Sequence, residues 1–154
     1  MICPECGAAL PGEETCSDRF GALLSAERDE DGQPTEAAYA HGLTVMTFYL
    51  QHAGGIGYTK RYMVDSASVA MRQIFIEGRD QAEVLPVGRR AERQKAAATA
   101  KAQPGANDPI TTIIGPLAGE LTITSLDPEN MTGHLERVKA WARSVAEHRV
   151  FNLA

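Results

Sequence analysis

Three cysteines stand within the first sixteen residues of this 154-residue chain, and the remainder contains none. Cys3 and Cys6 belong to the pattern CPECG, a C-x-x-C turn followed by glycine, and Cys16 stands a short way further along. Such a turn brings two sulfur atoms to one ion, and zinc prefers four cysteine or histidine ligands in a tetrahedron. Residues 1–16 therefore predict a zinc knuckle that needs one more ligand from elsewhere in the chain.

Two other uses of the cysteines are less consistent with the pattern. A redox pair of the thioredoxin type begins a helix after a β-strand, and no strand pattern precedes Cys3. A disulfide framework would leave one of three thiols unpaired. No secretory signal pattern is present, so a reducing cytoplasm is expected, where clustered thiols more often bind metal. Zinc is the expected cofactor, and iron is the other metal that this donor set suits.

The rest of the chain is dominated by helical periodicity. Apolar residues recur at helical spacing after Ser17 or Asp18, where Phe20 and Leu23 are followed by the aliphatic stem of Glu27. Further helices are expected between capping and terminating residues, from Thr35 to Gly54, from Thr59 to Gly78, in the Ala-rich stretch near residue 95, and from Asp127 onward.

These elements predict a mainly α-helical fold, an irregular four- to five-helix bundle with an N-terminal zinc knuckle and at most a short β segment. A chain of this length is expected to form one domain. Its parts are a zinc knuckle (1–16), a helical core (17–85), a basic Ala-rich helix and loop (86–109), and a short extended segment followed by the C-terminal helix (110–154).

The geometry of a helical hairpin suggests the fourth zinc ligand. If the first two helices turn back near residue 32, residue 16 faces residue 48. His52 then lies about one helical turn, roughly 6 Å, beyond Cys16, whereas His41 lies about 10 Å away in the other direction. His52 is therefore the first candidate for the fourth ligand, and His41 is the reserve.

Histidines also stand among the core positions of two helices. His41 and His52 share a face with Phe48, and His134 lies on the apolar face of the last helix with Trp141. Each histidine can be a buried imidazole that bonds a carbonyl or a carboxylate. Alternatively, His41 and His134 approach each other across the bundle and bind a second metal or a substrate.

Charge limits the classes of partner. The net charge of −5 repels nucleic acid and anionic membranes. No apolar run reaches the roughly 18–20 residues of a membrane span. The basic stretch from Arg89 to Lys101 could contact RNA, but it contains no aromatic residues for base stacking. A protein partner is more consistent with this composition than nucleic acid or membrane.

The motifs also resemble a known family. CPECG, HGLTVMTFYLQH and the final GHLERVKAWARSV together resemble a bacterial family known only as a domain of unknown function, over most of the chain. Its pattern matches Leu43, Thr44, Val45, Gln51, Val138 and Ala142, together with His41, His52, His134 and Trp141. The family usually has proline where this chain has Ala53. The resemblance implies no activity, but it implies that the three histidines have a role.

The function expected from the sequence is therefore that of a cytoplasmic zinc-binding protein, an interaction or regulatory module. Its structural zinc is held by Cys3, Cys6, Cys16 and His52. The alternative is a metal-dependent enzyme that uses a cluster of His41 and His134 within the bundle.

Overall fold

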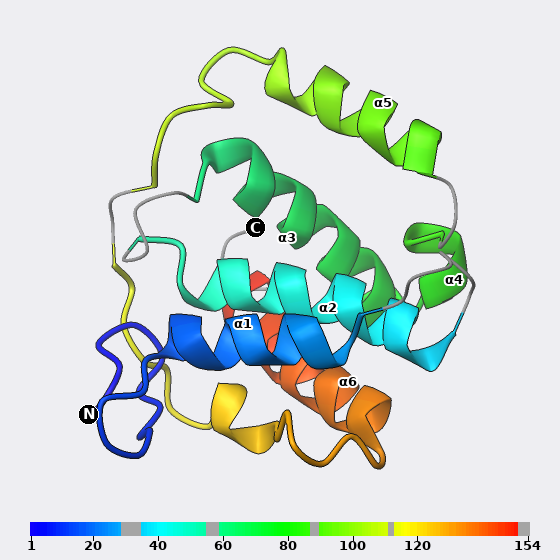
Figure 1. Ribbon diagram of the computed structural model, residues 1–154. Helices are drawn as coiled ribbons and strands as arrows, with labels where there is room; N and C mark the ends of the chain where they lie inside the picture. The colour runs from blue at the N-terminus through cyan, green and yellow to red at the C-terminus, as the bar shows by residue number, and fades with distance from the viewer. Residues whose placement is uncertain (29–34, 55–58, 87–89, 111–112, 151–154) are drawn as a thin grey trace.

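The computed structural model describes residues 1–28, 35–54, 59–86, 90–110 and 113–150. These residues contain no β-strand, only two isolated antiparallel bridges, Ile2 with Ala9 and Lys60 with Pro109. The predicted mainly α-helical bundle is confirmed (Figure 1). The helices within the described residues are α1 (Cys16–Ala26), α2 (Glu36–Gln51), α3 (Arg61–Phe75), α4 (Gln81–Val84), α5 (Arg90–Lys101) and α6 (His134–Val145), with a 3-10 turn, η1 (Ile123–Ser125), and a π-helical turn, η2 (Ala146–Val150), that continues α6.

Helix α2 occupies the centre of the bundle. It packs against α1, α3 and α6, with α1 in front of it and α6 behind in the view of Figure 1. Its apolar residues point to several neighbours, and Leu43, Phe48 and Leu50 are all buried. Thr35 caps its first turn by accepting a hydrogen bond from the Ala38 amide at 3.2 Å, as predicted. A helix that is apolar on more than one face suits this central position.

Helix α6 completes the core from the other side of α2. Val138, Trp141 and Val145 are fully buried, as their helical spacing predicts. The predicted start at Asp127 is wrong, because the helix begins only at His134. Gly133 has φ +68°, a left-handed conformation that interrupts any helix entering from the preceding residues.

Asp127 makes a local turn before α6. Its side chain accepts a hydrogen bond from the Glu129 amide at 2.9 Å, a bond typical of an Asx turn. The described part of residues 110–126 is not paired into a strand, and it ends in the 3-10 turn η1, which buries Ile123. This segment crosses from the neighbourhood of the N-terminus to the start of α6 (Figure 1).

Helix α5 lies on the outside of the molecule, along α3 (Figure 1). Arg93, Lys95 and Lys101 are exposed, and the Lys101 ammonium lies 5.5 Å from the centre of the Tyr62 ring. Arg89, the first residue of the basic stretch, lies outside the described residues. An exposed, Ala-rich helix with one cation over an aromatic ring agrees with a solvated surface helix.

None of the described helices has the length and apolar character that crossing a bilayer requires. That the whole chain forms a single domain, with the boundaries given above, stays a prediction.

Candidate metal centre

Backbone hydrogen bonds shape the turn that carries the first two cysteines. The Gly7 amide donates to the Cys3 carbonyl and the Cys3 amide donates to the Ala8 carbonyl, both at 2.9 Å. Gly7 has φ +80°, a left-handed conformation that residues with a side chain rarely adopt. The Ala8 amide then donates to Cys6 Sγ at 3.4 Å. The CPECG sequence thus folds into a knuckle in which a backbone amide already supports one sulfur atom.

The third cysteine is fixed by the start of α1. Thr15, not the expected Ser17 or Asp18, is the N-cap, so Cys16 is the first helical residue. The Thr15 hydroxyl accepts from the Asp18 amide at 3.1 Å, and the Asp18 carboxylate accepts from the Thr15 amide at 2.9 Å. This reciprocal capping box sets the direction in which α1 begins, and with it the position of the Cys16 side chain.

His52 reaches the same place from the end of α2, where it is the C-cap residue. The Phe20 and Phe48 rings stack with their centroids 4.0 Å apart, and the His52 ring continues this stack 4.2 Å from Phe48. This stack shifts the register by one helical turn from the predicted pairing of residue 16 with residue 48, so that Cys16 lies level with His52. The turn expected near residue 32 lies outside the described residues.

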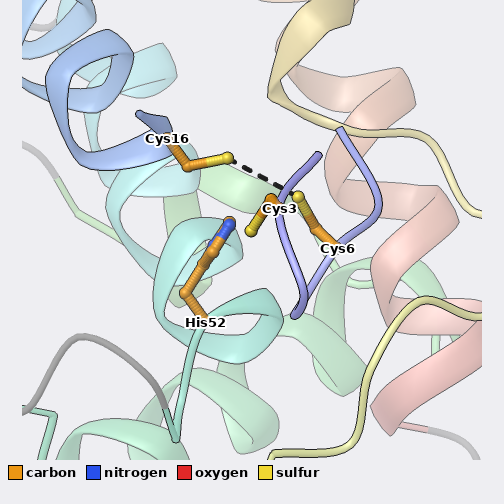
Figure 2. A group of neighbouring side chains, drawn as sticks. All are labelled: Cys3, Cys6, Cys16 and His52. Atoms are coloured by element: carbon orange, nitrogen blue, oxygen red, sulfur yellow. Dashed lines mark hydrogen bonds between the residues drawn. The ribbon is translucent and has the colours of Figure 1, made fainter. Parts of the chain in front are cut away.

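The ligand atoms of Cys3, Cys6, Cys16 and His52 all lie within 4.8 Å of one another. Figure 2 shows the three sulfur atoms and the imidazole ring turned toward a common centre, with the knuckle on one side and the two helix ends on the other. Three of these residues are buried, and Cys3 is partly exposed. Within the described residues this is the one group of such side chains that could hold a metal ion.

The sulfur spacing fits a tetrahedral ion. Cys6 Sγ and Cys16 Sγ are 3.7 Å apart, well beyond a disulfide bond, and all three cysteines are free. Two sulfur atoms, each about 2.3 Å from one zinc ion at a tetrahedral angle, would lie about 3.8 Å apart. The distance between these two atoms is therefore the one that a shared zinc ion requires.

The His52 ring is oriented for ligation. Its Nδ1 lies 3.0 Å from the Phe48 carbonyl oxygen, which fixes a proton on that nitrogen. Its Nε2 is buried and makes no hydrogen bond to any described residue. A buried hydrogen-bond acceptor without a partner lowers the stability of the fold. A histidine that binds a metal with one nitrogen characteristically donates a hydrogen bond to a carbonyl with the other, as His52 does. The donor set and the unpaired Nε2 both fit a zinc ion.

The two buried thiols perturb each other's ionisation. The hydrogen bond from Cys16 lowers the pKa of Cys6 to about 4, against the opposing effect of burial. The same contact, together with desolvation, raises the pKa of Cys16. In this pair the Cys16 thiol donates a hydrogen bond to the Cys6 sulfur. A cation that binds both sulfurs as thiolates would replace the proton between them.

A buried ion pair holds the knuckle against the end of the chain. The Arg149 guanidinium makes two hydrogen bonds of 2.8 Å to Glu120, and both side chains are almost fully buried. The guanidinium also donates to the carbonyl oxygens of Gly115 and Glu5, at 3.1 and 3.4 Å. The Glu5 carboxylate in turn accepts from the Gly54 amide at 3.1 Å. Four segments of the chain, the knuckle, the residues after α2, residues 115–120 and η2, are thus joined by these contacts.

Gln51, the residue before His52, joins this network to the core. Its side-chain amide donates to Glu120 at 2.9 Å and to the Leu121 carbonyl at 2.8 Å. The indole N–H of Trp141 donates to the Gln51 side-chain oxygen at 3.0 Å. The hydrogen bonds of Gln51 therefore fix the end of α2 next to His52.

The other two histidines of the sequence prediction are brought to one residue, Glu27. His134 Nε2 lies 2.5 Å from Glu27 Oε2, and His41 Nδ1 lies 3.5 Å from Glu27 Oε1. The Thr44 hydroxyl donates to Oε2 at 2.6 Å. His41, the reserve candidate for the fourth ligand, does not lie near the cysteines. It contacts Glu27 at the C-terminal end of α1, whereas Cys16 is at the N-terminal end.

Glu27 was not among the predicted functional residues, although the sequence carries a signal for it. It falls on the apolar stripe of α1, after Phe20 and Leu23, and it is 1% exposed. A carboxylate at a core position must find hydrogen-bond donors or a counter-charge. Because His41 and His134 lie on helices that are expected to face this one, they are the natural partners of Glu27, and the cluster could have been predicted on this ground.

The profile of a family described as "Family of unknown function (DUF5946)" matches residues 1–149. This match confirms the resemblance to an uncharacterised family that the motifs suggest. No curated protein matches the chain. No solved structure matches it either.

Proposed function

Since the chain belongs to DUF5946, a family whose description states no activity, we propose a function from its geometry: it is a zinc-binding protein with one structural zinc ion. The proposed ligands are the side chains of Cys3, Cys6, Cys16 and His52.

The observation that carries this proposal is the unpaired Nε2 of His52. Nε2 is buried, a ring nitrogen of His52 lies within 4.8 Å of three sulfur atoms, and Nδ1 is bonded to a carbonyl. Without an ion, the Nε2 lone pair is desolvated and no described residue donates a hydrogen bond to it. Three thiolates and one imidazole are a donor set that zinc prefers. An ion at the common centre would satisfy all four atoms at once.

The set of ligands also supports a structural role over a catalytic one. Four protein donors fill a tetrahedral zinc ion and leave no position for a water molecule or a substrate. The bound ion would tie the knuckle to the ends of α1 and α2, so that metal binding contributes to folding. We accordingly propose an interaction or regulatory module of the reducing cytoplasm, which three free cysteines suit, with a protein as its partner.

The enzyme alternative, with a metal on His41 and His134, is not favoured by the distances around Glu27. Two donors of one ion, each about 2.1 Å from it at right angles, lie about 3 Å apart. His134 Nε2 and Glu27 Oε2 are 2.5 Å apart, which is a hydrogen-bond distance. His134 Nε2 and Glu27 Oε2 thus bond each other, and neither residue belongs to the group of described side chains that could hold a metal ion.

Metal analysis of matched histidine variants tests the proposal. We expect one zinc ion per chain in the wild type and in His41→Ala, whose side chain contacts Glu27 and not the cysteines. His52→Ala is expected to weaken zinc binding at least about a hundredfold in competition with a chelator, because one ligand is lost. His52→Cys restores a fourth donor and should recover most of the affinity. Cobalt(II) substitution should give the absorption of tetrahedral sulfur ligation in the wild type.

The ligand assignment would be overturned if His52→Ala kept full zinc affinity while His41→Ala lost it. A wild-type chain that binds no zinc under reducing conditions would contradict the proposed function itself.

A further inference from the structure

A hollow of about 360 Å³ lies between the N-terminal half of α2, α4 and the start of α5. Helix α4 lies beside this half of α2 (Figure 1), and the Gln81 side chain donates to the Tyr39 carbonyl at 3.0 Å across the gap. Most of the lining is apolar, and two cationic or ionisable side chains, His41 and Arg93, also line it. This size and this mixture of surfaces are those of a small-molecule site.

His41 connects the hollow with the buried carboxylate. Its Nδ1 faces Glu27 Oε1 at 3.5 Å, and that oxygen has no hydrogen bond to any described residue. The far nitrogen, Nε2, stands on the other side of the imidazole ring, and the His41 side chain is 48% exposed. The buried carboxylate thus lies on the Nδ1 side of the imidazole ring, and the ring also lines the hollow. His41 therefore offers an imidazole nitrogen to a ligand in the hollow.

Gly42 gives a second, independent indication. It lies inside α2, where glycine costs about 1 kcal/mol relative to alanine. Neither backbone nor packing demands it: its φ is not positive, and an added Cβ would meet only Leu85 Cδ1, at 3.7 Å. Gly42 and Leu85 both line the hollow. The missing side chain keeps this space open.

The charges at the hollow complement an anion. Arg93 is exposed on α5 and pairs with no carboxylate of the described residues, while Glu83 of α4 is paired with Arg79 at 3.0 Å. The carboxyl group of Glu27 is buried behind His41, and its Oε2 bonds His134 Nε2. A ligand entering the hollow thus meets His41 and Arg93 and an otherwise apolar wall.

We propose that this hollow binds a small organic acid, with its hydrocarbon part between α2 and α4 and its carboxylate at His41 and Arg93. The carboxylate would accept hydrogen bonds from both side chains, and the apolar part would be buried against Met46 and Leu85. This proposal is independent of the zinc site, which lies at the other end of α1.

Titration of the zinc-loaded full chain with hexanoate, followed by amide and histidine-ring NMR, tests the proposal. We expect saturable binding with a Kd of about 1 mM or tighter, and shifts at Gly42, Leu85 and the His41 ring. Hexan-1-ol and hexylamine carry the same hydrocarbon without the negative charge, and each should bind at least about tenfold more weakly. Equal affinity for all three compounds would overturn the proposed recognition of an acid.

Two variants of α5 test whether the charge of Arg93 contributes to binding. Arg93→Gln is expected to weaken hexanoate binding about five- to tenfold, since a charge-assisted hydrogen bond is lost. Lys95→Gln removes an equal charge from the same exposed helix, outside the hollow, and should leave the Kd unchanged. Equal losses in the two variants would mean non-specific attraction and would contradict the proposal.

Two substitutions of helical glycines test whether the space beside Gly42 is the binding site. Gly42→Leu fills the hollow and should abolish binding, whereas Gly21→Leu projects into open space on α1 and should leave binding intact. If Gly42→Leu disturbs the fold, Gly42→Ala serves in its place, with a higher melting temperature and weaker hexanoate binding expected. Unchanged binding in a folded Gly42→Leu protein would exclude this hollow as the site.

Discussion

Replacement of Cys6 by alanine is expected to lower the free energy of unfolding of the zinc-loaded protein by about 4 kcal/mol or more, one of the largest effects of any single substitution in this chain. Cys6 is buried and supplies one of the four proposed ligand atoms, and its sulfur also accepts a hydrogen bond from the Ala8 amide. In a domain of this size, such a loss lowers the melting temperature by roughly 8–16 °C. Calorimetry of the zinc-loaded chain in a reducing buffer measures it.

A chelator identifies how much of this loss comes from the metal. Adding EDTA should lower the melting temperature of the wild type by a similar amount and leave that of Cys6→Ala unchanged. Glu13→Ala, an exposed change in the same segment, should behave as the wild type in both conditions. A wild type whose melting temperature does not respond to chelation would show that the cysteines support the fold without an ion.

Hydrogen exchange should show where this stability resides. The amides of Cys3 and Gly7 are bonded only within the knuckle, so they should lose protection when zinc is removed. The amides of α6, around the buried Trp141, should keep most of theirs, because Trp141 is fully buried and bonds Gln51, and neither is a proposed zinc ligand.

Breaking the buried ion pair between Arg149 and Glu120 is expected to have the second large effect. Arg149→Met should cost about 3–5 kcal/mol, because it leaves the Glu120 carboxylate buried with only Gln51 as a side-chain donor. The double variant Arg149→Met/Glu120→Met should regain much of the loss, since no charge then remains buried. Urea unfolding of the two variants, with equal metal content, measures both effects.

The exposed pair of Lys139 and Glu136 is the matched control. Their side chains are 3.6 Å apart and 41% and 79% exposed, so Lys139→Met should change the free energy of unfolding by less than about 1 kcal/mol. An equally small effect of Arg149→Met would contradict the view that this ion pair fastens the end of the chain to the knuckle.

The grouping of the four proposed ligands could be predicted from the sequence because each step of that prediction is local. A C-x-x-C turn and the rise per residue of a helical hairpin together favour His52, and not His41, as the histidine near the cysteines, and the structure groups His52 with them. The register itself differs from that count by four residues, about one helical turn, because Phe20 stacks on Phe48 where the count pairs it with residue 44.

Other features depend on information that spacing does not contain. The late start of α6 is due to one left-handed glycine, Gly133, after a proline and a capping residue that favour an earlier start. The pairing of Arg149 with Glu120 joins residues that share no helix, and neither a repeat nor a motif marks them. Periodicity shows which side chains are buried, but it does not show which buried polar groups become partners.

The separation of Cys16 from His52 has a consequence for the order of events during synthesis. Cys16 is synthesised before His52, and 36 more residues must be added before the proposed fourth ligand exists. At about 5–20 residues per second, the thiols wait for roughly 2–7 s without the imidazole that would complete the proposed site. During that interval the sulfur atoms of a newly made chain are open to oxidation or to a thiophilic metal such as copper(I). Closing the metal site is therefore an event that follows the emergence of α2.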